Sequence, residues 1–331
     1  MSERQASRLA VIGAGGIAGA YVDIVAGTDE LEAVAVADVR LPAASALAEK
    51  MGCAAVETAE EVLAFEPDAV VLCTPPATHP EMAQLFFRHG VAVLSEKPLA
   101  VDRHAATAMA RAATDAGLLL GMATKFRFCD DVVAARDLLA DGSLGRLRLV
   151  ENAFTSRVDM GSRWNSDPAI SGGGVIVDNG THSVDLVRFV AGPVAEVLAV
   201  ESARPEGFVV EDTVTLHLRT EDDVDATVDL SWSIDKSLSD FLHLYGTEGE
   251  VRVGWRESAW RRYGQDWQVI GPGYAKVPAM SGAVVQFARA LRGEEELAVT
   301  PADGIAAAQV VDACYESLRQ GAWVKIADLQ P

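Results

Sequence analysis

The stretch that decides the fold is RLAVIGAGGIA, Arg8 to Ala18. Its first part is an apolar run without polar alternation, typical of a strand buried on both faces. After it, residues 17–26 have helical composition. In this strand–turn–helix context a first glycine permits a tight turn, and a second lets the backbone approach a pyrophosphate. The pattern predicts a dinucleotide site at the helix start, formed by Gly13, Gly15, Gly16, Ile17 and Ala18, with Ala18 at the third glycine position.

Apolar runs and helical segments alternate from this stretch as far as residue 125. Strand-like runs cover 31–40, 68–76, 91–98 and 118–126, and helical composition covers 41–52, 79–90 and 102–117. Strands without alternation, each followed by a helix, predict a parallel sheet covered on both faces. We therefore expect residues 1–125 to form a doubly wound α/β domain of the Rossmann type.

The pattern changes after about residue 130. Residues 129–145 indicate one connecting helix, and a last helix is expected at about 301–320. Between them, alternation at period two appears in 146–154, 195–203, 213–220, 224–234, 241–247 and 249–255. Such alternation predicts an antiparallel sheet with one solvated face. We expect residues 126–331 to form a second α/β domain.

Charge and composition exclude several classes of function. The net charge of the 331 residues is −20, divided as −7 over residues 1–125 and −13 over 126–331, so a nucleic-acid partner is not expected. No stretch is long and apolar enough to span a bilayer, and the polar first eight residues do not resemble a secretory signal. The four cysteines and six histidines are scattered, which predicts reduced thiols and no metal site. We expect a cytoplasmic protein.

The residue at the end of the second strand distinguishes between dinucleotides. A carboxylate at Asp38 accepts hydrogen bonds from the ribose hydroxyls and repels a 2′-phosphate, which favours NAD over NADP. Val39 and Arg40 follow it. A swing of Arg40 toward a phosphate leaves NADP open as the alternative.

Two further motifs lie at strand ends that face the same crevice, where open α/β sheets bind ligands. The first is CTPPATH, residues 73–79; its prolines are either breakers or part of the cofactor site. The second is Ser95-Glu96-Lys97-Pro98, which ends an apolar run. Pro98 favours an extended backbone at Lys97 and so aims its ammonium. The alternative for Glu96 and Lys97 is a surface ion pair in a loop.

A third motif carries a histidine between two carboxylates. In GGGVIVDNGTHSVDLVRF, Asp178, His182 and Asp185 are spaced by four and three, which places them on one face of a helix that begins early enough. Gly180 either leaves room for a ligand or marks the true helix start. A histidine held by a carboxylate is a candidate general base.

Together these motifs resemble the Gfo/Idh/MocA oxidoreductases over nearly the whole chain. The resemblance rests on GAGGIA with Asp38, on TPPATH, on Glu96-Lys97-Pro98, on residues 125–128, on the Asp178–His182–Asp185 segment and on the tail from Pro301 to Ile326. It implies a Rossmann domain followed by an α/β domain on a large, mostly antiparallel open sheet. It also implies that this sheet joins subunits into a homodimer or homotetramer.

The resemblance implies hydride transfer between nicotinamide and a carbon bearing a hydroxyl on a sugar, amino sugar or cyclitol. Lys97 then contacts the reacting oxygen and the cofactor ribose, His182 exchanges the hydroxyl proton, and Asp178 holds both or relays between them. Glu96 orients the cofactor, and the Lys97–Pro98 bond is often cis in the family. The cofactor-binding set is completed by Thr74, Pro75, Pro76 and His79.

Departures from the family pattern concern the substrate. Many relatives have a tyrosine near 123–125, where this chain has Lys125, and Arg127 serves either substrate or structure. In the loop 156–168 we expect Arg163, Trp164 and Asn165 to contact a sugar ring. Two other functions stay open: a nucleotide-binding sensor without catalysis, and a reductase of an imine or tetrapyrrole. The acidic second domain suggests a cationic aminoglycoside or aminocyclitol as substrate.

Overall fold

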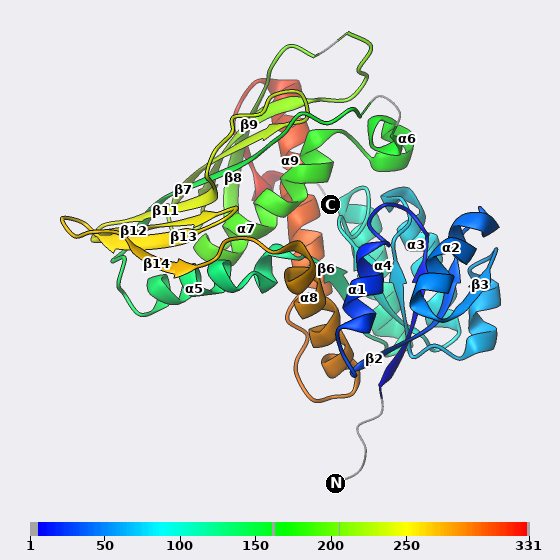
Figure 1. The fold of residues 1–331 in the computed structure, drawn as a ribbon. Helices are drawn as coiled ribbons and strands as arrows, with labels where there is room; N and C mark the ends of the chain where they lie inside the picture. The colour runs from blue at the N-terminus through cyan, green and yellow to red at the C-terminus, as the bar shows by residue number, and fades with distance from the viewer. Residues whose placement is uncertain (1–5, 161–162, 205, 330–331) are drawn as a thin grey trace. The chain divides into compact units, whose positions relative to one another are not determined.

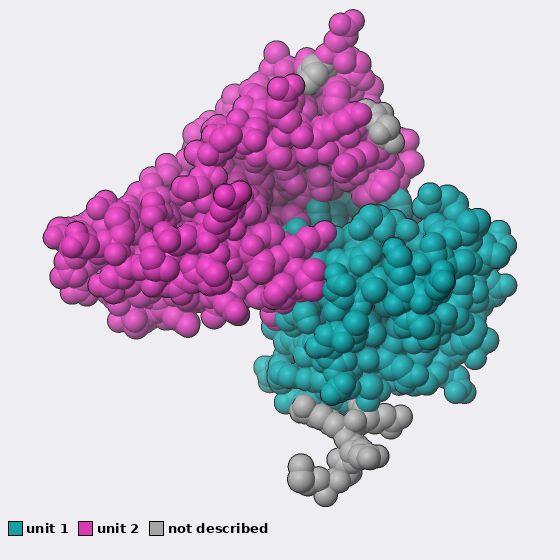
Figure 2. Space-filling model, in the orientation of Figure 1, with its two compact units in different colours: residues 1–125, 280–305 teal, residues 126–279, 306–331 magenta. Residues whose placement is uncertain are grey.

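The structure is a computed structural model that describes residues 6–160, 163–204 and 206–329. It forms two compact units (Figure 2). The first unit comprises residues 1–125 and 280–305, and the second comprises 126–279 and 306–331. The polar residues 1–5 lie outside the described part of the chain, as do residues 161–162 of the predicted ring-contact loop.

A parallel sheet forms the centre of the first unit (Figure 1). Within the described residues it has six strands in the order β3-β2-β1-β4-β5-β6. The strands are β1 (Ser7–Ile12), β2 (Leu31–Ala37), β3 (Ala54–Val56), β4 (Ala69–Leu72), β5 (Ala92–Glu96) and β6 (Leu120–Ala123). All residues of β4, β5 and β6 are buried, as their uninterrupted apolar runs predict. The predicted doubly wound fold is confirmed.

The helices of this unit follow from the strand order. They are α1 (Ala20–Ala26), α2 (Leu41–Met51), α3 (His79–Arg88) and α4 (Arg103–Ala116), with single turns at Glu60–Phe65 and Pro76–Thr78. The chain proceeds outward from β1 in one direction and from β4 in the other. Right-handed crossovers therefore place α1 and α2 on one face and α3 and α4 on the other. The order reverses between β1 and β4, and such a switch point is where ligands bind in these folds.

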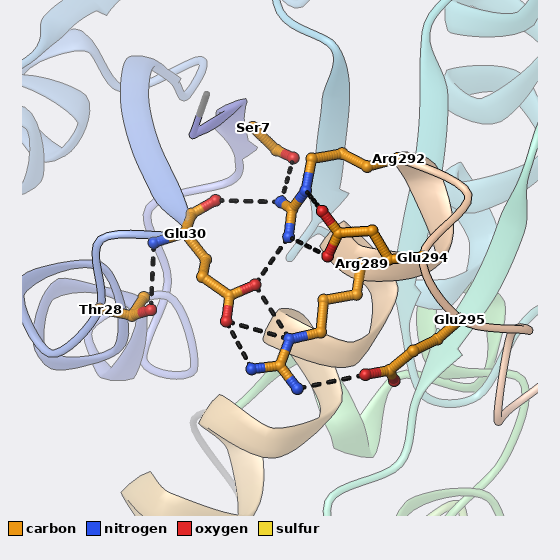
Figure 3. A network of polar contacts seen from close by, with 7 residues as sticks. All are labelled: Ser7, Thr28, Glu30, Arg289, Arg292, Glu294 and Glu295. Carbon is orange, nitrogen blue, oxygen red and sulfur yellow. Dashed lines mark hydrogen bonds and ion pairs between the residues drawn. The ribbon is translucent and has the colours of Figure 1, made fainter. Parts of the chain in front are cut away.

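A segment from the C-terminal half completes the first unit, which differs from the expected division at residue 125. Helix α8 (Lys276–Leu291) continues into residues assigned to this unit. Glu30 precedes β2, and its carboxylate accepts hydrogen bonds from Arg289, at 2.5 Å, and from Arg292, at 2.7 Å (Figure 3). The ring of Phe287 packs against Gly121 in β6. These contacts join residues far apart in the sequence, so no local pattern indicates them.

A second, mostly antiparallel sheet forms the centre of the other unit. Within the described residues it has nine strands in the order β14-β13-β12-β11-β7-β10-β9-β8-β15, of which β7 and β10 alone pair in parallel. The strands are β7 (Leu147–Thr155), β8 (Val194–Glu201), β9 (Thr213–Thr220), β10 (Asp225–Ser231), β11 (Asp240–Gly246), β12 (Gly249–Gly254), β13 (Ser258–Arg262), β14 (Gln268–Gly271) and β15 (Val324–Lys325). The open, mostly antiparallel sheet that the family resemblance implies is confirmed.

Helices cover one face of this sheet (Figure 1). They are α5 (Asp130–Ala140), α7 (Thr181–Ala191) and α9 (Pro301–Gln320). The unit also has the short helix α6 (Pro168–Ser171) and short turns at Phe126–Phe128, Trp164–Ser166 and Ile326–Asp328. Alternate residues of the strands join α5, α7 and α9 in one hydrophobic core. The opposite face carries polar contacts such as Tyr245 to Glu151, at 2.8 Å. This is the solvated face that the period-two alternation predicts.

The sequence left some elements unassigned. They are α6, α8 and the short strands β3, β13, β14 and β15. These segments are short or rich in small residues, and their periodicity is weak. No helix in the described part of the chain has the length and hydropathy of a bilayer span.

The Glu30 network generates a stability prediction. Hydrogen bonds from Arg289, and then from Arg292, lower the pKa of Glu30 from 4.5 to about 2. Because its folded pKa is lowered, Glu30 stabilises the fold fully above about pH 4.5, and this stabilisation is lost as the pH falls toward 2. We expect Glu30→Gln to lower the free energy of unfolding by about 1–2 kcal/mol at pH 7. The difference in unfolding free energy between this variant and wild type, measured by urea titration, should become smaller as the pH falls from 4.5 to 3.

Glu32→Gln is the matched control. Glu32 pairs with Arg8 at 3.6 Å and its side chain is 56% exposed, so its loss should change stability by less than about 0.5 kcal/mol. Equal effects of the two substitutions at pH 7 would contradict the role of the network.

Candidate active site

The glycine turn after β1 has the geometry of a dinucleotide site. Gly13 has a φ of +97°, and a Cβ there would lie 2.9 Å from the carbonyl carbon and oxygen of Cys73, which follows β4. Gly13 is thus required by the close approach of two chain segments at the switch point. At Gly15 and Gly16 a Cβ would meet nothing within 4 Å. The protein's own packing does not require glycine at these two positions, whereas a pyrophosphate lying against the backbone does.

The helix after this turn begins later than predicted. Residues 16–19 form turns, and α1 starts at Ala20 rather than at Ile17. Ala18 is fully buried and donates its N–H to the Gly15 carbonyl at 3.1 Å. Ile17 and Ala18 therefore belong to the loop that offers its backbone to a phosphate.

Asp38 lies beside this loop, as predicted. Its Oδ2 accepts a hydrogen bond from the Ala14 N–H at 2.7 Å, and its Oδ1 accepts one from the Arg40 N–H at 2.9 Å. The Arg40 Nε lies 3.4 Å from the same carboxylate. Asp38 thus ties the glycine loop to the end of β2, while Val39 is 84% exposed.

The residues after β4 divide into a surface part and a buried part. Thr74 and Pro75 are half-buried, Pro76 is buried, and the Thr78 hydroxyl donates to the Pro75 carbonyl at 2.8 Å. His79, predicted to bind the cofactor, is only 1% exposed. Its ring nitrogens face backbone carbonyls and the Ser95 hydroxyl inside the unit. The His79 side chain thus points into the interior of the unit, and its ring nitrogens are used by the protein's own chain.

Glu96 ends β5 as a buried carboxylate. Tyr21 of α1, itself fully buried, donates its hydroxyl to Glu96 Oε1 at 2.9 Å. Burial raises the pKa of Glu96, while the Tyr21 hydrogen bond and the charges of Lys97 and Lys125 oppose that rise. Two ammonium groups, one beyond β5 and one beyond β6, therefore act on one buried carboxylate. The alternative of an exposed Lys–Glu pair does not apply to Glu96.

The peptide bond between Lys97 and Pro98 is cis, as the family resemblance implies.

Near Glu96, burial raises the pKa values of the Tyr21 hydroxyl and the Cys73 thiol. The Tyr21 hydroxyl that donates to Glu96 thus keeps its hydrogen.

In the second unit the α-helix begins after Asp178, and Gly180 marks its start, one of the two alternatives left open for that glycine. Residues Ile176–Gly180 form a π-helical turn, and the α-helix α7 begins at Thr181. The four-residue spacing of Asp178 and His182 thus spans a change in helix type. The Trp232 indole donates its N–H to Asp178 Oδ2 at 3.3 Å. Such π-turns are frequent at functional sites because they reorient single side chains.

His182 lies within the first turn of α7 and is 8% exposed. Its ring makes edge contacts with Phe126, at 5.2 Å between centroids, and with Phe154, at 6.4 Å. Packing against these aromatic rings restricts the imidazole to one orientation. A restricted imidazole is suited to exchanging a proton at a defined position.

Asp185 was predicted to share one helix face with Asp178 and His182, but its carboxylate is paired with Arg127. Its carboxylate receives two hydrogen bonds from Arg127 Nε at 3.0 Å and one from Nη2 at 2.6 Å, and both side chains are nearly buried. Arg127 also lies over the ring of Phe189, with 5.4 Å between the guanidinium carbon and the ring centroid. This geometry favours the structural role left open for Arg127. Removing one partner of a buried ion pair of this kind lowers the free energy of unfolding by about 3–5 kcal/mol.

The triple glycine before Asp178 serves packing rather than ligand access. A Cβ at Gly174 would lie 2.1 Å from the Glu211 carbonyl oxygen, and one at Gly173 would lie 1.8 Å from the Tyr315 hydroxyl. A Cβ at Gly180 would meet the Leu230 side chain at 3.1 Å, so that position leaves no room for a ligand.

The sequence reasoning missed two residues that hold this segment. Glu211 Oε1 accepts hydrogen bonds from the N–H groups of Gly174 and Ile176, at 2.9 and 3.0 Å, and from the Tyr315 hydroxyl at 2.7 Å. Burial raises the pKa of Glu211. The acidic pair Glu211-Asp212 before a strand was the available signal, but its partners lie 35 to 104 residues away.

The predicted ring-contact residues lie on the surface of the second unit. Arg163 and Trp164 are exposed, the latter at 43%, and Asn165 is half-buried in the turn Trp164–Ser166. Within the described residues, no group of three or more His, Cys, Asp or Glu side chains is arranged to hold a metal ion.

Comparison with known families accounts for both units. Residues 7–124 match the oxidoreductase family with an NAD-binding Rossmann fold, and residues 132–252 match the GFO/IDH/MocA C-terminal domain. The chain is 33% identical to trans-1,2-dihydrobenzene-1,2-diol dehydrogenase of Oryctolagus cuniculus over 248 residues, which cover 73% of this chain and 74% of the relative. This chain belongs to the GFO/IDH/MocA oxidoreductase family.

Two other proteins are similar to this chain over nearly the full length. Inositol 2-dehydrogenase of Rhizobium meliloti (strain 1021) is 27% identical, with 97% of this chain and 99% of the relative covered. The crystal structure of GenD2 from gentamicin A biosynthesis in complex with NAD is 27% identical, with a TM-score of 0.85 and coverage of 97% and 96%. The first unit is therefore an NAD-binding Rossmann domain, and the family resemblance seen in the sequence is confirmed.

The two kinds of glycine in the turn generate a paired prediction. Gly15→Ala should change the unfolding free energy by less than about 0.5 kcal/mol, because its Cβ enters open space. It should weaken NADH binding at least about 10-fold, because that space is where the pyrophosphate approaches. Fluorescence titration with NADH and thermal unfolding measure the two effects.

Gly13→Ala should show the opposite balance. Its positive φ and the 2.9 Å approach to Cys73 predict a loss of about 2–3 kcal/mol in unfolding free energy. NADH affinity equal to wild type for Gly15→Ala would contradict the placement of the pyrophosphate.

Proposed function

We propose that this oxidoreductase transfers a hydride between NAD and a secondary hydroxyl or keto carbon of a sugar, amino sugar or cyclitol. The observation that carries the proposal is Lys97 beside the buried carboxylate of Glu96 at the carboxyl edge of an NAD-binding Rossmann sheet. A surface ion pair needs no such burial. A buried counter-charge with its own tyrosine donor supports an ammonium that stabilises a developing oxyanion.

The proton chemistry is proposed to come from the second unit. When bound, NAD accepts the hydride from the carbinol carbon, and the hydroxyl proton must leave at the same time. We propose that His182 takes this proton in oxidation and returns it in reduction. We propose that Asp178, oriented by the Trp232 indole N–H, supports the charged form of the imidazole.

The preference for NAD over NADP is proposed from Asp38. Its carboxylate is fixed by two backbone N–H groups at the end of β2, so it cannot turn away from an incoming ribose. A 2′-phosphate at that place would meet a fixed negative charge. Arg40 is paired with the same carboxylate, which reduces its value as a phosphate ligand.

Among the possible substrates we propose aminocyclitols and aminoglycosides as the first to test. The similarity to inositol 2-dehydrogenase and to GenD2 from gentamicin A biosynthesis supports a cyclitol or amino sugar ring. The net charge of −13 over residues 126–331 favours a cationic substrate by long-range attraction. Lys125, Arg163, Trp164 and Asn165 remain the proposed substrate contacts, whereas Arg127, predicted with them, is paired with Asp185.

We also propose that the solvated face of the second sheet associates with further copies of this chain. Strand β8 presents Val200 there at 51% exposure, and Arg219 of β9 lies over the exposed Trp323. Apolar groups at such positions are typical of subunit interfaces. A mass in solution of two or four times 35.0 kDa would agree with this proposal, and a monomer would refute it.

The proposed function is tested by spectrophotometry at 340 nm. Purified protein is titrated with NADH and NADPH and then assayed with NAD⁺ against myo-inositol, neutral sugars, aminocyclitols and nucleotide sugars. We expect tight NADH binding and turnover of a polyol, with aminocyclitols preferred. Tight binding without any turnover would favour the sensor. Turnover confined to nucleotide sugars would refute the cationic substrate.

Substitution of the proposed catalytic groups sharpens the test. Lys97→Ala and His182→Ala should each lower kcat by about 100-fold or more, while the Kd for NADH changes less than about 5-fold, because each group acts on the transferring proton or oxyanion. Near-normal kcat in either variant would remove that residue from its role.

A further inference from the structure

The buried imidazole of His79 links two segments that carry functional residues. His79 begins α3 in the first unit and is 1% exposed. Its Nε2 lies 2.9 Å from the Thr74 carbonyl oxygen. Its Nδ1 lies 2.9 Å from the Ser95 hydroxyl, 3.1 Å from the Pro98 carbonyl and 3.3 Å from the Leu99 carbonyl. One ring therefore contacts the chain on both sides of Lys97 and the chain after β4.

These contacts lie beyond the end of the sheet. Strands β4 and β5 pair in parallel as far as Leu72 with Ser95. Thr74 and Lys97 both follow that last pair, so no ladder fixes the distance between them. Pro98 has no N–H and so cannot donate a backbone hydrogen bond of its own. A side chain is needed to hold the two strand extensions together.

The donor and acceptor roles around the ring follow from its partners. A carbonyl oxygen only accepts, so Nε2 must carry a hydrogen toward Thr74. In the neutral ring, Nδ1 accepts from the Ser95 hydroxyl when that hydroxyl turns from the Glu96 carbonyl, which lies 3.1 Å from it. In the imidazolium, Nδ1 donates to the Pro98 and Leu99 carbonyls. Burial lowers the pKa of His79, which favours the neutral form. In both forms the ring bridges Thr74 and the Ser95–Leu99 segment.

We propose that His79 is a positioning residue that holds Lys97 in register with the cofactor-binding segment at Thr74. This inference rests on the role proposed for Lys97. Its Nδ1 side fixes the backbone around Lys97, and its Nε2 side fixes the backbone that meets the cofactor. The two sets of contacts are expected to affect different quantities. Loss of the Nδ1 contacts should lower kcat through Lys97, and loss of the Nε2 contact should weaken dinucleotide binding.

Two isosteric substitutions separate the two sides. The amide nitrogen of His79→Gln occupies the place of Nε2, so the Thr74 bond persists and the Ser95–Leu99 side is lost. We expect kcat to fall about 10- to 100-fold, because a displacement of about 1 Å at a catalytic group has that effect. The Kd for NADH should stay within about 3-fold of wild type.

His79→Asn places its amide where Nδ1 lies and loses the Thr74 bond. We expect the Kd for NADH to rise about 5- to 10-fold, as for one lost hydrogen bond, with kcat within about 3-fold of wild type. Substitution of exposed His89, the residue that caps the C-terminus of the same helix, by Gln and by Asn is the matched control. Its Nδ1 faces only the Leu85 carbonyl, so neither constant should change.

A readout without substrate tests the position of Lys97 directly. Competitive acetylation with acetic anhydride, followed by peptide mass spectrometry, compares the modification rate of Lys97 with that of exposed Lys50 in the same sample. His79→Gln should change the ratio more than about 3-fold, whereas His89→Gln should leave it unchanged. Ser95→Ala, which removes only the hydroxyl facing Nδ1, should change the ratio in the same direction by a smaller factor.

The outcomes distinguish this inference from the proposed function. If Lys97→Ala retains turnover, Lys97 is not catalytic and the proposed function fails. If Lys97→Ala is inactive while His79→Gln keeps both kcat and the acetylation ratio of wild type, the positioning role of His79 fails alone. Parallel losses of kcat and NADH affinity in both His79 variants, with an unchanged acetylation ratio, would show a merely structural residue.

Discussion

The burial of one carboxylate, that of Glu96, is the constraint around which the first unit is organised. An ionised group at the end of a fully buried strand is costly unless charges and donors surround it. Tyr21 supplies a hydroxyl from α1, and Lys97 and Lys125 supply positive charge from beyond β5 and β6. The helix after the glycine turn is thereby linked to the strand end that carries Lys97. The dinucleotide loop and the ammonium proposed for catalysis thus share one support.

Parallel pairing makes this support possible. The carboxyl ends of β1, β4, β5 and β6 meet at one edge, so residues distant in the sequence become neighbours. The close approach of Gly13 to Cys73 shows how tightly the segments converge there. Any side chain at Gly13 would separate β1 from β4, whereas Gly15 and Gly16 leave space that the protein itself does not fill. Packing requires the first glycine, and we propose that cofactor binding requires the other two.

Much of the fold was predictable because its signals are local. The strand–glycine–helix pattern and the change to period-two alternation after residue 130 each depend on neighbouring residues. The placement of Asp38 beside the glycine loop followed for the same reason. The attachment of residues 280–305 through Glu30, Arg289 and Arg292 was not predictable, since it joins positions about 260 residues apart.

The candidate site was predictable in composition but not in detail. Asp178, His182 and Asp185 suggest one helix face, but a π-turn interrupts that helix and Arg127 binds Asp185. The turn depends on Glu211 and Tyr315, whose contacts with Gly174 no spacing rule reports. His79 reads as a cofactor ligand because the motif around it faces the crevice. Its own side chain turns inward, because backbone carbonyls there require a donor.

A common principle connects these cases. Regular hydrogen bonding ends or changes near three of the residues proposed for the site. The ladder of β4 and β5 stops two residues before Thr74 and Lys97, and Asp178 lies in the π-helical turn that precedes α7. Buried polar side chains take over at these points. His79 does so beside Lys97, and Trp232 does so beside Asp178. Backbone that leaves a ladder needs other partners for its polar groups, and a side chain that provides them also determines where the next residue points. The positions of the groups proposed for catalysis therefore depend on how the backbone is satisfied where regular structure ends or changes.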